Sequence, residues 1–437
     1  MTTTAYRASL LDYTGDPAID TGATRYVADG LLVVQNGRVV GHGEYAAVRA
    51  LHRDAQVIDH SGKLILPGLI DAHVHYPQTT MIASYGAQLL SWLEQYAFPT
   101  ELGFADRAHT DVIAKFFLEE LLRNGTTTAV VLCTAHPQSV DVLAERAVQL
   151  GMRLVLGKIC SDRNVPDGLR DTAQTAYDDS KALIERWHGR ERLSYALTPR
   201  FAPACTDAEL EAIAQLHREH PTTYVHTHLA ENKQELAWVA ELYPGVRSYT
   251  EAYARFGLLT ERSIFAHGIH LDDADLAGLA AARSTIAFCP TSNLFLGSGL
   301  FPLSRVKRAG VPIAIATDVG AGTSFSVLRT LSEAYKVMQL QGDSLSAHQA
   351  LHLATLGSAE SLSLGEHIGN FLPGKEADFI VLDEAATPLT ALRSQYARTL
   401  EERLFALLML ADDRAVAATY VRGECVHTRV PGRAEIG

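Results

Sequence analysis

Two histidines, His73 and His75, stand two residues apart at the end of a short apolar run and could bind a metal ion. Residues i and i+2 of a β-strand project from the same face, so both imidazoles would point the same way. Nitrogen ligands of this kind suit zinc or iron. The alternative is a chance pair of buried or surface histidines that bind nothing.

Three further potential ligands end apolar runs later in the chain: His228, His267 and Asp318. His228 is preferred to His226 because it lies nearer the end of its run, so we expect His226 in the core or behind the ligands. Imidazoles and a carboxylate around a divalent cation leave a position open for water, and such a metal lowers the pKa of that water to about 7. The sequence therefore predicts a metal-dependent hydrolase.

Two carboxylates of this set could move protons. Glu231 stands where a strand-like run gives way to a helical segment, and there it could act as a general acid and base. Its alternative is a first-turn helix glutamate, favoured by the helix dipole. Asp318 ends an apolar run before a glycine-containing loop, and its alternative is a helix N-cap. We expect Glu231, Asp318 and His267 to be the catalytic residues.

Alternating elements must position these side chains. From Leu64 onward, short runs rich in Val, Ile and Ala alternate with segments of helical periodicity, as in parallel sheets covered by helices. Eight such runs can be counted, at residues 69–75, 127–134, 154–161, 193–201, 223–230, 264–269, 286–290 and 313–318. They predict a (β/α)8 barrel of the TIM type, in which the carboxyl ends of all strands converge on one face.

The two ends of the chain have a different pattern. Residues 26–43 predict a β-hairpin, because Asn36-Gly37 suits the positive φ of a type I′ turn. After helical segments at 326–339 and 346–363, residues 371–382 return to turn and strand chemistry. We therefore expect residues 1–66 and 369–437 to form a small β-sandwich domain, with the barrel at residues 67–368.

Composition excludes several classes of function. The formal net charge of -12 gives no basic footprint for nucleic acid. Five scattered cysteines without a CxxC pair suggest neither a disulfide framework nor a thiolate zinc site, and fit the reducing cytoplasm. No run approaches the ~20 apolar residues of a membrane span. We expect a cytoplasmic protein that acts on a small molecule, with neither nucleic acid nor membrane as partner.

The ligand motifs, in their order, resemble the amidohydrolase superfamily across nearly the whole chain. They are Pro67-Gly68-Leu69-Ile70-Asp71-Ala72-His73-Val74-His75, His228, His267 and Thr317-Asp318. The resemblance implies one zinc ion per subunit, with iron as the alternative, held by His73, His75, His228, His267 and Asp318. Members differ in whether the histidine at the position of His267 contacts the metal or the hydroxide. Relatives are commonly dimers, so we expect a homodimer.

Within the superfamily, several segments resemble members that deaminate the free base guanine, at residues 76–78, 81–86, 90–93, 98–101, 198–201, 228–232 and 289–294. The resemblance implies a purine pocket in which Gln78 and Arg200 bind the polar edge and Phe201 packs on the ring, with His228, Glu231 and Asp318 also at the substrate. A guanidinium only donates hydrogen bonds, so Arg200 suits a carbonyl oxygen. The alternatives are a surface salt bridge for Arg200, core packing for Phe201 and loop solvation for Gln78.

The implied reaction is hydrolysis of guanine to xanthine and ammonia, a step of purine catabolism. Asp318 would help to deprotonate the attacking water, and Glu231 would protonate the ring nitrogen and then the leaving amine. The Pro-Cys-x-x-Cys signature of deaminases acting within nucleic acid does not occur, which favours a free base. The alternatives are another aminated ring (8-oxoguanine, cytosine, a triazine or an adenosine derivative) or a barrel that serves only as a scaffold.

Overall fold

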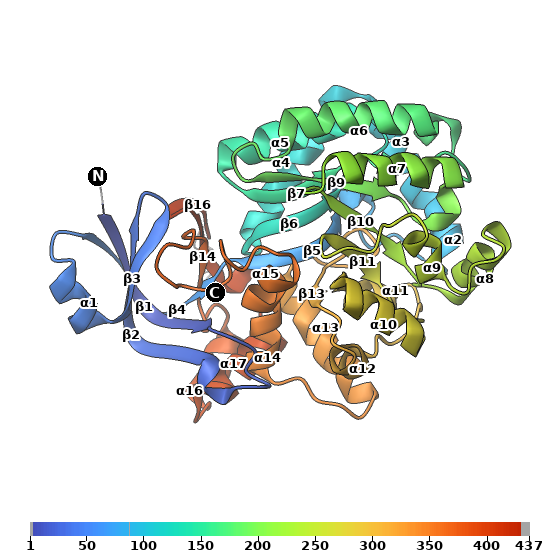
Figure 1. The fold of residues 1–437 in the computed structure, drawn as a ribbon. Coiled ribbons are helices and arrows are strands. Elements are labelled where there is room, and N and C mark those ends of the chain that lie inside the picture. The colour runs from blue at the N-terminus through green and yellow to red at the C-terminus, as the bar shows by residue number, and fades with distance from the viewer. Residues whose placement is uncertain (1–2, 87, 430–437) are drawn as a thin grey trace, which may run out of the picture.

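The computed structural model describes residues 3–86 and 88–429, which fold into a barrel and a smaller β domain (Figure 1). The barrel strands follow the spatial order β13-β12-β11-β10-β9-β7-β6-β5, all neighbours are parallel, and β8 pairs with β9. Their bounds are β5 (Leu69–His75), β6 (Thr126–Leu132), β7 (Arg153–Gly157), β8 (Ile159–Cys160), β9 (Leu193–Pro199), β10 (Tyr224–Leu229), β11 (Ser263–His267), β12 (Thr285–Phe288) and β13 (Ile313–Ile315). The predicted barrel is confirmed, and the third expected run is divided between β7 and β8.

The first and last barrel strands meet through a small polar junction. The backbone N–H of His75 donates to Val319 O at 2.7 Å, and that of Asp318 donates to His73 O at 2.9 Å. The buried Asp71 carboxylate accepts from the backbone N–H of Thr317 at 3.0 Å and from its hydroxyl. Asp71 therefore fastens the end of the barrel to its beginning, beside the predicted ligands.

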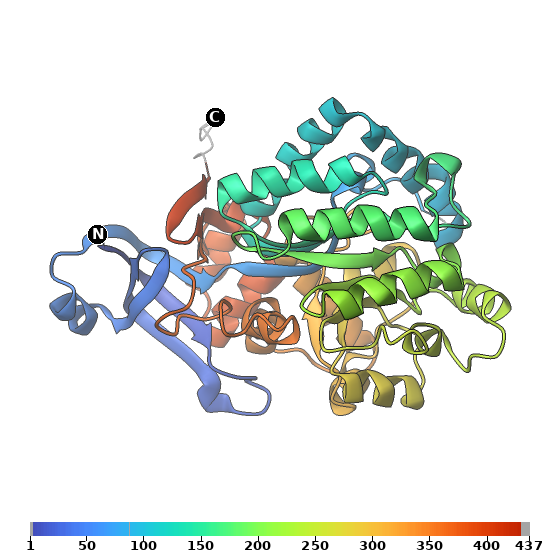
Figure 2. The ribbon, with the colours of Figure 1, turned by 45° about the horizontal axis from the view of Figure 1, so that its top comes forward.

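Helices cover the outside of the barrel strands (Figure 2). The longer ones are α4 (Arg107–Arg123), α5 (Pro137–Leu150), α6 (Ala173–Trp187), α7 (Asp207–Glu219), α8 (Lys233–Leu242), α10 (Asp273–Ala282) and α13 (Val327–Leu340). The shorter ones are α2 (Leu89–Trp92), α3 (Phe98–Leu102), α9 (Tyr249–Ala254), α11 (Pro290–Phe295), α12 (Leu303–Arg308), α14 (Ala347–His352) and α15 (Ser358–Ser361). α4 ends before its C-cap Asn124, and Gly151 caps α5 with a left-handed φ of 65°.

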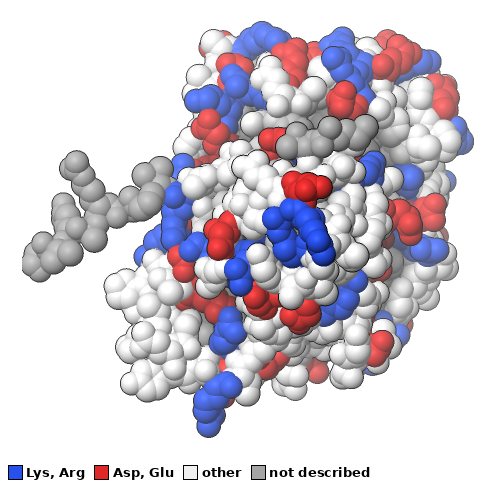
Figure 3. All heavy atoms as spheres, turned by 90° about the vertical axis from the view of Figure 1, so that its left-hand side faces the viewer, with Lys and Arg blue, Asp and Glu red and all other residues white. Residues whose placement is uncertain are grey.

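Both ends of the chain contribute strands to one seven-stranded sheet, in the order β16-β15-β14-β4-β1-β2-β3. The strands are β1 (Thr3–Tyr13), β2 (Thr24–Gln35), β3 (Arg38–Glu44), β4 (Gln56–Pro67), β14 (Phe379–Leu382), β15 (Val416–Val421) and β16 (Glu424–Thr428), with the helix α1 (Tyr45–Leu51) after β3. The predicted hairpin is confirmed: Gln35 pairs with Arg38, and Asn36 and Gly37 have φ of 53° and 73°. On the face in Figure 3, acidic and basic side chains are intermixed.

The C-terminal segment contains two helices that we did not expect from the sequence, α16 (Pro388–Gln395) and α17 (Leu400–Leu410). The second, α17, packs on α13 and α14 and buries Leu404, Leu407 and Leu408. The spacing of three and four residues between these leucines is typical of one face of a helix. The division of the chain into domains at residues 66/67 and 368/369 stays a proposal.

Within residues 3–86 and 88–429, no helix has both the length and the apolar character needed to cross a membrane.

Candidate metal and catalytic site

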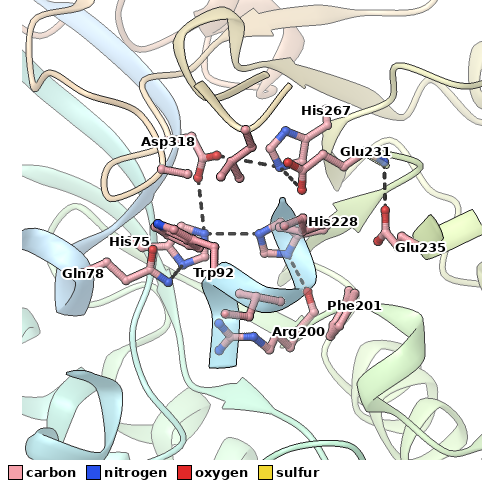
Figure 4. A pocket seen from close by; sticks show the side chains of 14 residues that line it. His75, Gln78, Trp92, Arg200, Phe201, His228, Glu231, Glu235, His267 and Asp318 are labelled. Carbon is pink, nitrogen blue, oxygen red and sulfur yellow. Dashed lines mark hydrogen bonds and ion pairs between the residues drawn. The ribbon is translucent and has the colours of Figure 1, made fainter. Parts of the chain in front are cut away.

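The carboxyl ends of the barrel strands bring the predicted site residues into one pocket of about 420 Å³ (Figure 4). Eight of the nine line it: His75, Gln78, Arg200, Phe201, His228, Glu231, His267 and Asp318. The ninth, His73, is fully buried beside this pocket, and its Nε2 lies 3.2 Å from His75 Nε2. Residues that are up to 245 positions apart in the chain therefore share one site.

Four side chains present ligand atoms that are linked by distances of the kind found around a tetrahedral metal. His75 Nε2 lies 3.2 Å from both His73 Nε2 and His228 Nε2. Asp318 Oδ1 lies 3.2 Å from His73 Nε2 and 3.4 Å from His75 Nε2. Ligands about 2.0 to 2.1 Å from a tetrahedral zinc are roughly 3.3 Å apart. The donor set therefore fits a zinc-sized cation.

The histidines of this set are neutral and their rings are held from behind. Burial lowers the pKa of His73, His75 and His228 well below its usual range, which leaves their lone pairs free for a metal. His73 Nδ1 lies 2.7 Å from His226 Nε2, and His228 Nδ1 donates to the backbone oxygen of Arg200 at 2.5 Å. His226 thus lies behind a predicted ligand. Such contacts through the far nitrogen orient a ligating imidazole.

His267 lies between the two carboxylates of the pocket. Its Nε2 is 3.4 Å from Glu231 Oε2 and 3.8 Å from Asp318 Oδ2, while Nδ1 lies 2.9 Å from Asn293 Oδ1. Burial lowers the pKa of His267, but the two carboxylates and Asn293 outweigh it and the pKa is raised. The geometry therefore suits both a metal contact and a contact to the attacking oxygen.

Glu231 is placed to donate a proton into the pocket. It precedes Asn232, the N-cap of α8, so the alternative of a first-turn helix glutamate is wrong. Its side chain is buried, and its Oε1 accepts from the Ser298 hydroxyl at 3.0 Å. Burial raises the pKa of Glu231, and the neighbouring Asp318 raises it further. A raised pKa favours the protonated form of the carboxyl group, which is the form that a general acid needs.

The backbone at two strand ends is turned sharply at the site. His267 and Asp318 have positive φ values of 74° and 52°, a region that residues other than glycine seldom adopt. The next helix, α13, begins after its own N-cap Ser326, so Asp318 is not a helix cap. Such conformations cost energy and occur where the surrounding structure enforces them, commonly at functional sites.

Two of the residues that we predicted to bind the substrate, Arg200 and Gln78, belong to a buried network around Glu101. Arg200 Nη1 and Nη2 donate to Glu101 Oε2 at 2.6 Å and Oε1 at 3.0 Å, and Gln78 Nε2 donates to Oε1 at 2.9 Å. Because Arg200 is only 3% exposed, the alternative of a surface salt bridge is wrong. Gln78 is buried as well, so loop solvation is wrong too. Phe201 lines the pocket beside them.

Several residues around the site escaped the sequence interpretation. Glu101, Ser298 and Asn293 contact Arg200, Glu231 and His267 from distant parts of the chain. Trp92 lines the pocket, and its indole N–H has no hydrogen-bond partner in the described part of the chain. The only signal for Glu101, Trp92 and Asn293 was their place within segments that resemble guanine-deaminating proteins. Ser298 carried no signal.

Comparisons with known proteins agree with this geometry. Residues 64–426 match the amidohydrolase family. The guanine deaminase of Escherichia coli (strain K12) is 49% identical, over 97% of this chain and 98% of the relative. The solved E. coli guanine deaminase superposes with a TM-score of 0.94 at 47% identity, over 98% of this chain and 100% of that one. A guanine deaminase from C. acetobutylicum, with guanine bound in its active site, has a TM-score of 0.89 at 25% identity, over 98% and 100% of the two chains.

Proposed function

The chain belongs to the amidohydrolase family, and from this membership we propose that it is a guanine deaminase, which hydrolyses guanine to xanthine and ammonia. The observation that carries the proposal is the layout of the pocket. His75, His228, His267 and Asp318 line the same pocket as Arg200 and Gln78, and Gln78 Nε2 lies 3.4 Å from His75 Nδ1. This chemistry belongs to purine catabolism.

The proposed cofactor is one zinc ion per subunit, held by His73, His75, His228 and Asp318, with His267 as a further ligand or as the contact to the attacking oxygen. The spacing of the four ligand atoms supports zinc. When bound, zinc lowers the pKa of a coordinated water to about 7 and so supplies a nucleophile at neutral pH. Iron remains the alternative, since imidazole and carboxylate suit it too.

The carboxylates divide the proton transfers between them. Asp318 accepts a proton from the attacking water, whose oxygen forms a bond to the ring carbon that carries the amino group. Glu231, whose raised pKa favours the protonated form, donates to the adjacent ring nitrogen and then serves the leaving amine. The proton of the new hydroxyl group passes through Glu231 to the amine, the carbon–nitrogen bond breaks, and the amine leaves as ammonia while the hydroxyl becomes the second carbonyl of xanthine. The ring nitrogen keeps the proton that Glu231 first donated, and the proton held by Asp318 returns to Glu231 to complete the cycle.

Arg200 and Gln78 supply the selectivity for guanine in this proposal, and Phe201 packs on the ring. The guanidinium N–H groups can donate to the carbonyl oxygen of guanine, whereas the amino group of adenine would meet them donor to donor. A site of this kind rejects the wrong base because buried polar groups would be left unpaired.

The direct experiment is to mix the zinc-loaded protein with guanine and to follow xanthine by absorbance and ammonia with a coupled assay. We expect one ammonia for each xanthine formed. Protein that contains zinc and yet releases no ammonia from guanine would refute the proposal. Ammonia from another aminated ring alone would identify a related deaminase instead.

Arg200→Lys is expected to raise KM for guanine by about 10- to 100-fold, because a charged hydrogen bond contributes roughly 1.5 to 3 kcal/mol. Lysine keeps a positive charge opposite Glu101 but loses the planar fork of donors. Steady-state kinetics with guanine measure the effect, and Arg190→Lys, on the opposite side of β9 in the sequence, serves as the matched control. An unchanged KM would mean that another group binds the carbonyl oxygen.

We also propose that the protein is a cytoplasmic homodimer. The buried free cysteines Cys133, Cys160, Cys205 and Cys289 suit a reducing compartment. We take α16 as the candidate contact surface for a second copy, because Leu389 and Leu392 are 61% and 54% exposed there. We expect sedimentation to give twice the chain mass, and a Leu389→Glu/Leu392→Glu variant to sediment as a monomer. A wild-type monomer would exclude the dimer, and a dimeric variant would exclude this surface.

A further inference from the structure

One buried carboxylate, Glu101, gathers the donors of both residues that we propose to bind guanine. It lies in α3, is 1% exposed and does not line the pocket. Its Oε2 accepts from Arg200 at 2.6 Å, and its Oε1 accepts from Arg200 at 3.0 Å and from Gln78 at 2.9 Å. Within the described residues, the two carboxylate oxygens of Glu101 accept side-chain hydrogen bonds from Arg200 and Gln78 alone.

These contacts fix which donors remain for a ligand. Two of the five N–H groups of the Arg200 guanidinium point at Glu101, which leaves three. The guanidinium carbon lies 4.9 Å from the centroid of the Phe98 ring, so the group is also held at its face. The Gln78 amide Nε2 donates to Glu101 at 2.9 Å and also lies 3.4 Å from His75 Nδ1, and its Oε1 lies 3.4 Å from the Gly320 N. These contacts give the amide one orientation, and the three remaining N–H groups of Arg200 are the free donors at this side of the pocket.

The same contacts decide the charge at this end of the pocket. An unpaired buried guanidinium would attract any anion of suitable shape. Paired with the Glu101 carboxylate, Arg200 contributes donors but almost no net charge. Guanine is a neutral base. Its deamination product has a second carbonyl group and a further ring N–H beside it, is therefore more acidic, and becomes an anion at alkaline pH.

We propose that Glu101 is a positioning residue that aims Arg200 and Gln78 at the substrate and cancels the charge of Arg200, so that the pocket prefers the neutral purine base to purine anions. The inference rests on the proposed function. It assigns Glu101 two separable effects, on the geometry of the donors and on the charge that a ligand meets. A carboxylate that merely held α3 against β9 would affect stability and leave ligand selectivity unchanged.

Glu101→Gln removes the charge and keeps the size of the side chain. We expect KM for guanine to rise about 10- to 100-fold with a much smaller change in kcat, because donors are misplaced while Glu231 and Asp318 are untouched. We also expect the xanthine anion to bind about tenfold more tightly than to the wild type at alkaline pH. Isothermal titration calorimetry with xanthine measures this without turnover. Glu94→Gln, an exposed glutamate seven positions earlier, is the matched control and should behave as the wild type.

Glu101→Asp separates position from charge. It keeps the carboxylate but shortens the side chain, so KM for guanine should rise while xanthine affinity at alkaline pH does not increase. Unchanged KM and xanthine affinity in both variants, or equal weakening of guanine and xanthine with a lower melting temperature, would overturn the proposal. A wild-type protein that releases no ammonia from guanine would refute the proposed function instead, so the two failures are distinguishable.

Discussion

Glu231→Gln will lower kcat for guanine by roughly 10²- to 10⁴-fold and change KM much less. Glutamine has nearly the same shape and can still accept a hydrogen bond from Ser298, but it has no carboxyl proton to deliver. The ring nitrogen and the leaving amine both need that proton. Because this proton transfer stabilises the transition state and does not contribute to substrate binding, the substitution lowers kcat and leaves KM nearly unchanged.

The matched control for this variant is Glu241→Gln. Glu241 is an exposed glutamate at the end of the same helix, α8, so the substitution makes the same change of charge outside the active-site pocket. We expect wild-type kinetics from it. Both proteins are measured by initial rates of xanthine formation over a range of guanine concentrations. A Glu231→Gln enzyme with unchanged kcat would show that another group delivers the proton.

Removal of the metal is expected to abolish guanine turnover. Three buried imidazoles with pKa values well below their usual range, together with Asp318, have no other evident reason to converge at 3.2 to 3.4 Å. Dialysis against a chelator should bring both metal content and ammonia release to background, and added zinc should restore both. His228→Ala should lower metal content and prevent this recovery.

The control for the histidine variant is His427→Ala, which changes a histidine of β16 in the small β domain. Its metal content and rate should match the wild type. Elemental analysis and ammonia release are measured on the same samples, so metal loss and activity loss can be compared directly. Full activity in protein that is free of metal would contradict the assigned cluster.

The fold could be predicted because its signals are local. Runs of buried β-branched residues marked each barrel strand to within a few positions, and β5 lies at its predicted bounds of residues 69–75. The turn at Asn36-Gly37 followed from the need for positive φ at both positions. His73 and His75 could be placed on one face because strand side chains alternate. Convergence of strand ends then brought His228, His267 and Asp318 to them.

The contacts that support these residues could not be predicted, because they join distant parts of the chain through side chains. Arg200 meets Glu101 at a separation of 99 positions, and Ser298 meets Glu231 at 67. Neither periodicity nor spacing encodes such a pair. The role of Asp71 was hidden for the same reason: its partner Thr317 lies 246 positions away. Sequence patterns therefore located the predicted ligands and carboxylates, and the structure was needed for the side chains that contact and orient them.

The most direct test of the account is the selectivity of the zinc-loaded protein across aminated rings, measured as kcat/KM from ammonia release. Guanine, 8-oxoguanine, adenine, cytosine and an aminated triazine form the panel. We predict that guanine exceeds adenine by about 10⁴-fold or more, because adenine leaves the donors of Arg200 unpaired. A comparable or higher kcat/KM for any other ring, or no ammonia from any member of the panel, would contradict the account.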